Sequence, residues 1–134
     1  MKKLLFLILI CCVQNMVSQN GSSTAPKSDD SHIYNTAGID VKPDFPGGYD
    51  KFFAFVDENF KYPEGNINLK GKKIYVTFIV EKDGSLSDIK ILRDAGHGTG
   101  DEALRVLKLS PKWSPGQHKG EIIRVLFSVP LILK

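Results

Sequence analysis

The chain has almost no cysteine, and the two cysteines that it has are adjacent. Cys11 and Cys12 lie inside an unbroken apolar run from Leu4 to Val13. A short basic stretch, Lys2 and Lys3, precedes about ten apolar residues, which is typical of a secretory signal peptide. Once this leader is removed no thiol is left, which excludes disulfides, thiol nucleophiles and cysteine metal sites. A lipid-modified cysteine is the alternative, but the small residue that normally precedes one is missing.

A long hydrophobic run is also missing. A membrane-spanning helix needs roughly 17–25 apolar residues, and Gln14 and Asn15 interrupt this one too early. We therefore predict that residues 1–18 are a signal peptide cleaved near Ser18, with an uncleaved inner-membrane anchor as the alternative.

An excess of charge of one sign is lacking as well. The formal charge is +3, and the loss of Lys2 and Lys3 lowers it by two, to +1. Such a small charge argues against electrostatic binding of nucleic acid. For an exported, nearly neutral chain without thiols we expect a bacterial periplasm or cell surface.

No pattern of catalytic or metal-binding residues is present. The three histidines, His32, His97 and His118, stand singly in predicted loops, without the spacing of metal ligands. Glycines surround His97 ahead of an expected helix, but Asp101 and Glu102 would repel a phosphate there, and no P-loop lysine follows. We therefore expect neither an enzyme nor a cofactor or metal site.

Large apolar residues are scarce between the leader and residue 40. Residues 19–40 are rich in Ser, Asn, Asp, Gly and Thr and show no periodicity. This composition predicts a flexible polar tether. The folded domain is then expected over residues 41–134.

The domain is expected to begin with a helix from about Tyr49 to Asn59, after the Asp44–Gly48 turn. Four apolar side chains recur there at helical spacing and predict one buried stripe: Phe52, Phe53, Val56 and Phe60.

A β-hairpin is predicted next. Apolar residues alternate from Ile74 to Val80, and a return strand runs from about Ser85 to Leu92. Asp83-Gly84 between them is typical of a two-residue hairpin turn. A second helix is expected from about Asp101 to Leu109, where Thr99 and Glu102 have the spacing of a capping box.

The last strand is expected from Glu121 to Leu133. Its odd-numbered residues, such as Ile123 and Phe127, are predicted to face the core because side chains alternate along a strand. Pro130 has no backbone N–H, so this strand is expected at a sheet edge. A free edge can accept another extended peptide.

This order of elements predicts an α+β fold. Consecutive strands pair, and the last strand joins them after a helix. The expected domain has two layers, a three-stranded, mostly antiparallel sheet packed on two helices. Trp113, in the turn before the last strand, is expected to anchor helix and strand, or alternatively to line a peptide groove.

From Tyr62 onward the sequence resembles the C-terminal domain of TonB proteins, the periplasmic arms that energise outer-membrane receptors. The upstream Phe45–Gly48 and its Phe-rich helix resemble the extension of Bacteroidetes relatives. The resemblance covers about ninety residues and rests on the order and spacing of these segments: Tyr62-Pro63, Gly71, Ile74–Val80, Lys82–Gly84, Asp88–Leu92, Ala103–Val106, Lys112–Gly116 and the final strand.

The resemblance implies a function in protein–protein interaction. In the family, a short receptor peptide, the TonB box, adds as a strand along the edge of the terminal strand, by β-augmentation, in support of energy-dependent transmembrane transport. The partner would be an outer-membrane TonB-dependent receptor. The contacts implied for this chain are Ile122, Arg124, Leu126 and Ser128, with Tyr62, Pro63 and Trp113 nearby.

Two features depart from the family. The helix after Tyr62-Pro63 is shortened, because Gly65 and Asn66 are poor helix formers. Energy transducers also need a spanning helix and a long Pro-rich spacer, whereas the predicted tether contains only Pro26. A cleaved chain would bind a receptor peptide without transmitting force, and a retained leader would restore that role. The alternative is an envelope structural or assembly protein that forms a homodimer through the terminal edge strand.

Overall fold

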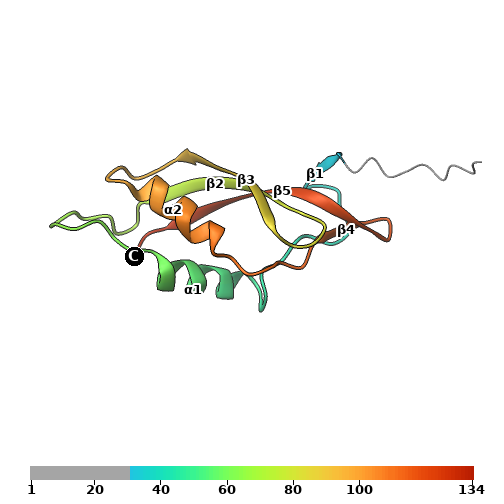
Figure 1. Cartoon of the computed structure of the whole chain (residues 1–134), viewed down its shortest axis with the longest axis horizontal. Helices are drawn as coiled ribbons and strands as arrows, with labels where there is room; N and C mark the ends of the chain where they lie inside the picture. Colours follow the sequence, from blue (N-terminus) through green and yellow to red (C-terminus); the bar gives the residue numbers. More distant parts are fainter. Residues whose placement is uncertain (1–30) are drawn as a thin grey trace, which may run out of the picture. The chain divides into compact units, whose positions relative to one another are not determined.

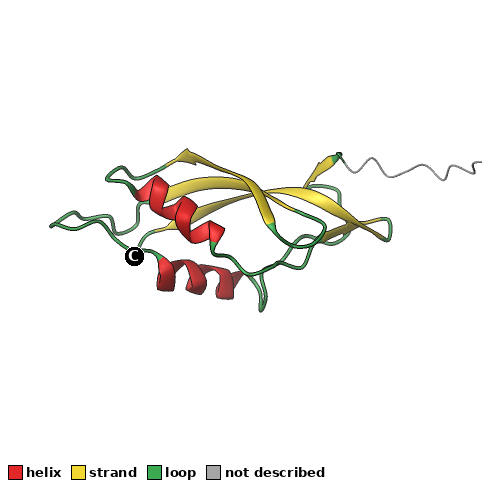
Figure 2. Ribbon diagram, in the orientation of Figure 1, coloured by secondary structure: helices red, strands yellow, loops and turns green. Residues whose placement is uncertain are grey.

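The computed structural model describes residues 31–134, and all structural statements below concern this part of the chain. The predicted leader and residues 19–30 of the predicted tether lie outside it. Figures 1 and 2 show the arrangement of the helices and strands. In chain order the elements are β1 (Ile33–Asn35), α1 (Tyr49–Asn59), β2 (Lys73–Val80), β3 (Leu86–Arg93), α2 (Thr99–Lys108), β4 (Gly116–His118) and β5 (Glu121–Ile132).

The fold is α+β, as predicted, but its sheet is larger than expected. Five strands take part, in the order β1-β5-β2-β3, with β4 paired to β5. β1 runs parallel to β5, and the other pairs are antiparallel. The prediction of three strands is wrong because β1 and β4 have three residues each, too few for an alternation to show in the sequence.

The long pairing of β2 with β5 forms the centre of the sheet. Its register extends from Lys73 opposite Ile132 to Val80 opposite Val125. The alternation predicted for β5 is confirmed, since Ile123 and Phe127 are buried and Ile122 and Leu126 are exposed. The side chains of one face therefore enter the core and those of the other face remain open.

Both helices contribute to the core on the same face of the sheet. α1 buries Phe52 and Val56, and α2 buries Ala103, Val106 and Leu107. Phe53, predicted in the buried stripe of α1, remains 37% exposed. It follows Phe52 directly, so it lies about 100° further around the helix. This rotation places Phe53 beside β5 instead of under the sheet.

The β2–β3 turn differs from the predicted two-residue loop. The last strand pair is Val80 with Leu86, and the Glu81 N–H donates to the Ser85 carbonyl at 2.8 Å. Three residues, 82–84, therefore connect the strands, and only Gly84 among them has a positive φ (87°). This is the longer hairpin loop that ends in a left-handed glycine.

The start of α2 also differs from the prediction. Gly98 is its N-cap, and no side chain caps the helix. Thr99 instead donates its hydroxyl to the Gly96 carbonyl at 2.7 Å. The Glu102 carboxylate accepts from the backbone N–H of Lys61 at 2.6 Å and from Arg105. The predicted capping box is wrong because Gly98, and not Thr99, is the N-cap, and the Glu102 carboxylate is engaged by Lys61 and Arg105 instead.

Candidate functional site

The candidate site is the outer flank of β5, defined here as its main chain from Phe127 to Ile132 on the side away from β2. On the opposite side, β2 pairs with β5 from Val125 to Ile132. On the outer side β1 pairs only as far as Leu126. Among residues 31–134, no strand pairs with the outer flank itself. The edge position predicted for β5 is therefore found only over this half of the strand.

Pro130 lies within this outer flank. A proline has no backbone N–H and is tolerated in a sheet where a strand has no neighbour to receive one. Pro130 is opposite Tyr75 of β2. The residue that predicted an edge thus coincides with the part of β5 that has an unpaired side.

α1 provides aromatic side chains next to the outer flank. The ring of Tyr49 lies 5.7 Å from the ring of Phe127, and Tyr49 is 40% exposed. Its hydroxyl donates to the Pro43 carbonyl at 3.2 Å. Burial, and then the charge of Asp44, raise the pKa of Tyr49, so this hydroxyl is protonated at neutral pH. Tyr49 and Phe53 are one helical turn apart and form a partly exposed aromatic surface along α1.

An apolar pocket of about 250 Å³ lies at the carboxyl end of β5. Phe53 and Val56 of α1 line one side, and Leu131 and Ile132 line the other. Lys134 and Asp57 also line the pocket and are joined by an ion pair of 2.8 Å. The hydrogen bond that Lys134 donates to the Asp57 carboxylate raises the pKa of Lys134. The pocket and the outer flank together offer main-chain hydrogen bonding beside an apolar recess.

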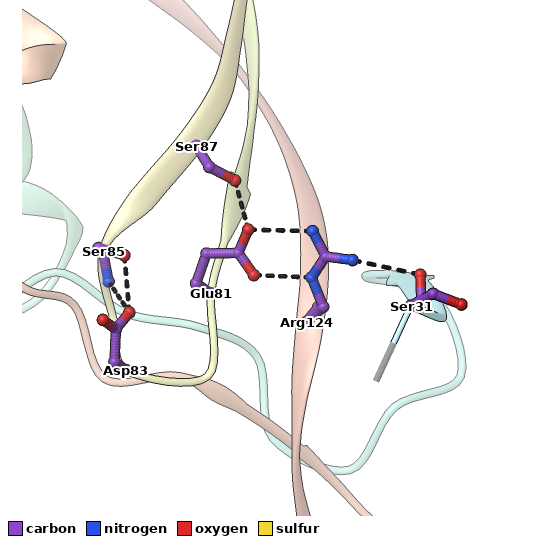
Figure 3. Close-up of polar contacts among 6 residues, drawn as sticks. All are labelled: Ser31, Glu81, Asp83, Ser85, Ser87 and Arg124. Carbon is purple, nitrogen blue, oxygen red and sulfur yellow. Dashed lines mark hydrogen bonds and ion pairs between the residues drawn. The ribbon is translucent and has the colours of Figure 1, made fainter. Parts of the chain in front are cut away.

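β1 occupies the neighbouring part of the same side of β5. Ile33, Tyr34 and Asn35 are opposite residues 124–126 in a parallel register. Arg124 donates to the Ser31 carbonyl at 3.2 Å, which ties the chain just ahead of β1 to β5 (Figure 3). Residues 33–35, predicted as tether, are therefore a strand of the sheet.

Glu81 holds Arg124 in place. The carboxylate accepts from Nε of Arg124 at 2.7 Å and from its Nη2 at 3.0 Å (Figure 3). The Ser87 hydroxyl donates to the same carboxylate at 2.5 Å. These hydrogen bonds, with Arg124 first, lower the pKa of Glu81. Arg124 therefore links β5 to Glu81 and to the chain ahead of β1, and its contact with a guest peptide stays a prediction.

The other predicted β5 contacts differ in their access. Ile122 is exposed, but it is opposite Gln117 of β4. Leu126 is 40% exposed, yet its main chain lies between β2 and β1. Ser128 is exposed and lies on the outer flank. Of the four, only Ser128 combines an exposed side chain with an unpaired strand side.

The remaining predicted contacts, Tyr62, Pro63 and Trp113, do not belong to β5. Tyr62 is 40% exposed and its hydroxyl accepts from the Lys134 N–H at 2.9 Å, so it lies near the end of β5. Pro63 is half-buried beside it in the chain. Trp113 is only 3% exposed. The alternative expectation, that it lines a peptide groove, is wrong, because four phenylalanine rings pack around it within 6 Å: Phe45, Phe52, Phe78 and Phe127.

Sequence reasoning missed Phe53, Tyr49 and Glu81 as parts of this region. Tyr49 and Phe53 are four residues apart and therefore lie on the same side of α1. The apolar pattern of a helix, however, does not show which side of the helix contacts a particular strand such as β5. For β4 the signal in the sequence was Gly120, because two-residue hairpin turns favour glycine, and the structure has such a turn at Lys119-Gly120 with positive φ at both residues.

Within residues 31–134, no group of three His, Asp or Glu side chains has an arrangement able to hold a metal ion. No helix in the same range has the length and apolar character needed to cross a bilayer. Comparison with known proteins gave no matching family model, no matching curated protein and no matching solved structure.

Proposed function

We propose that this chain is an exported module, similar to the C-terminal domain of TonB, that binds an extended segment of an outer-membrane TonB-dependent receptor by strand addition. The guest strand would pair with the outer flank of β5. One observation carries the proposal: among residues 31–134, no strand pairs with the outer flank of β5 over residues 127–132, whereas the other side of the same residues pairs with β2.

The neighbouring side chains suit such a guest. Main-chain hydrogen bonds contribute affinity without regard to sequence, and recesses for alternate side chains contribute selectivity. A guest strand on this flank would extend the sheet over Tyr49 and Phe53 of α1, whose rings are each more than one third exposed. An apolar guest residue near Ile132 would reach the 250 Å³ pocket. No covalent chemistry is needed for this function.

A titration of the ¹⁵N-labelled chain with peptides from receptor N-termini tests the proposal. We expect amide shifts concentrated over residues 127–132, with smaller shifts in α1 near Phe53. A peptide with proline at its central position is the matched control, because it lacks a main-chain donor and should bind more weakly. Shifts that avoid β5 altogether would contradict strand addition.

Self-pairing is the competing outcome of the same geometry. A second copy could place its own outer flank antiparallel against this one, which is the expected arrangement in a two-fold dimer. Sedimentation equilibrium with and without peptide separates the two. A monomer that binds peptide supports the receptor proposal, whereas a dimer that peptide does not disturb supports an assembly role.

A further inference from the structure

A second recess lies at the β2–β3 side of the sheet, apart from the outer flank of β5. It has a volume of about 420 Å³ and is formed by the start of β2, the end of β3 and the chain just after β3. Three of the residues that line it are basic, and one is aromatic: Lys72, Lys73, Arg93 and Tyr75.

The strand register explains why these side chains converge. Tyr75 and Arg93 are direct cross-strand partners, so their side chains leave the same face of the sheet. Lys73 precedes Tyr75 by two residues and therefore shares that face. The base of the recess is fixed by main-chain hydrogen bonds, from the Gly71 N–H to Leu133 and from the Leu133 N–H to Lys72, both at 2.8 Å.

The positive charges of the recess are not neutralised within the described part of the chain. No carboxylate of residues 31–134 lies within ion-pair distance of Lys72, Lys73 or Arg93. By contrast, Lys90, three residues before Arg93 on β3, pairs with Asp88 at 3.5 Å.

Asp94 is the one acidic side chain that lines the recess. Its Oδ1 accepts the backbone N–H of Gly96 at 2.8 Å. Its Oδ2 lies close to Gly100, at 2.5 Å from the position that a Cβ atom would take there. The carboxylate is therefore directed towards the loop before α2 rather than towards the basic side chains.

We propose that this recess binds a phosphate group carried by a small ligand or a lipid head group. Two lysines and an arginine provide donors that all carry charge, and the planar fork of Arg93 matches the oxygen geometry of a phosphate. The Tyr75 ring, 40% exposed, offers a flat surface for the part of the ligand that carries the phosphate. Three cations against one engaged carboxylate fit a doubly charged anion better than a single carboxylate.

An NMR titration of the labelled chain with glucose 6-phosphate tests this proposal, with glucose as the uncharged control. We expect amide shifts in residues 71–75 and 93–95 with the phosphate and none with glucose. In the double variant Lys73→Gln/Arg93→Gln the affinity should fall about tenfold or more, since hydrogen bonds between charged groups are among the stronger ones. Lys90→Gln, which removes one positive charge from β3 outside the recess, should leave the affinity unchanged.

Vesicles distinguish the two sources of the phosphate. Cosedimentation with phosphatidylglycerol vesicles but not with phosphatidylcholine vesicles, abolished in the double variant, assigns a lipid head group. Binding of glucose 6-phosphate without cosedimentation assigns a soluble ligand. The proposal is overturned if neither probe binds, or if the double variant and Lys90→Gln weaken binding equally.

Discussion

Gly84 is a residue whose replacement the fold should tolerate poorly. It adopts φ +87° in the β2–β3 turn, and a Cβ added there would lie 2.1 Å from the carbonyl oxygen of Trp113. The Trp113 N–H also donates to the Gly84 carbonyl at 2.8 Å. Since the obstacle is backbone, it cannot move aside by rotating a side chain. The β2–β3 turn therefore contacts the main chain of Trp113, a core residue, directly at Gly84.

We predict that Gly84→Ala lowers the free energy of unfolding by about 3 kcal/mol or more, through backbone strain and steric overlap together. Gly120→Ala is the matched control, because Gly120 has φ +78° and nothing within 4 Å of the added Cβ. It should cost only about 1 kcal/mol. Urea denaturation of both variants gives the two values. Equal losses would show that the overlap with Trp113 is relieved and that only the φ angle matters.

Asp83, in the same turn, carries an unusually acidic carboxyl. Its pKa falls to about 2, chiefly because the Ser85 hydroxyl and then the Ser85 N–H donate to it. The two distances are 2.6 and 2.9 Å (Figure 3). The folded state favours the charged carboxylate, so the contribution of this group to stability is present above its ordinary pKa of 3.8 and is lost as the pH falls towards 2.

We predict that Ser85→Ala raises the pKa of Asp83 towards its ordinary value, because the strongest donor is removed. Ser87→Ala is the matched control, since the Ser87 hydroxyl donates to Glu81 and not to Asp83. Carboxyl ¹³C shifts followed against pH report the Asp83 titration directly. An unchanged titration in Ser85→Ala would assign the low pKa to the backbone donor and Lys112 instead.

At the scale of elements, the long ones were predictable and the short ones were not. β5 has twelve residues whose alternation is legible, and α1 begins and ends at the predicted residues. β1 has three residues with mostly exposed side chains, so no hydrophobic pattern marks it. Its position depends on pairing with a strand about ninety residues later in the chain. Such long-range pairing cannot be read from local periodicity.

The sequence predicted the existence of the candidate site but not its extent. Pro130 and the alternation of β5 pointed to an edge, and the structure leaves residues 127–132 unpaired on one side within the described chain. The extent of the edge was overestimated because β1 pairs with residues 124–126. Arg124 was expected to contact a partner because alternation along β5 places it on the same face as Ile122 and Leu126. Its bond to Glu81 links residues 43 positions apart, which no sequence pattern shows.

Phe53 lies between α1 and β5 and should contribute to the affinity for a guest peptide. We predict that Phe53→Ala weakens binding of a receptor peptide about tenfold, because a partly exposed ring loses the apolar area that the guest would cover. Leu92→Ala is the control, since Leu92 is 64% exposed but belongs to β3, which does not adjoin β5. Isothermal titration of the two variants makes the comparison. Equal affinities would place the guest away from α1.

For the molecule as a whole, the question is what β1 does to the partner-binding side of β5. β1 begins at Ile33, eight residues before the predicted start of the domain at residue 41. β1 covers residues 124–126 on the side where the guest is proposed to pair. Ile33 is 40% exposed, and little apolar area depends on this strand. A weakly held strand of the same chain thus occupies part of the edge that a partner would use.

We predict that a chain beginning at Ala37 is less stable than one beginning at Ser31 by only about 1–2 kcal/mol, the contribution of a few main-chain hydrogen bonds. This start keeps the Asp40 carboxylate, which accepts the Lys119 N–H at 2.8 Å, and the Glu81–Arg124 ion pair. Removal of β1 lengthens the unpaired side of β5 towards Arg124, so peptide affinity should rise severalfold. Urea denaturation and peptide titration of the two chains measure both effects. A loss of affinity in the shorter chain would mean that β1 forms part of the binding site instead of competing for it.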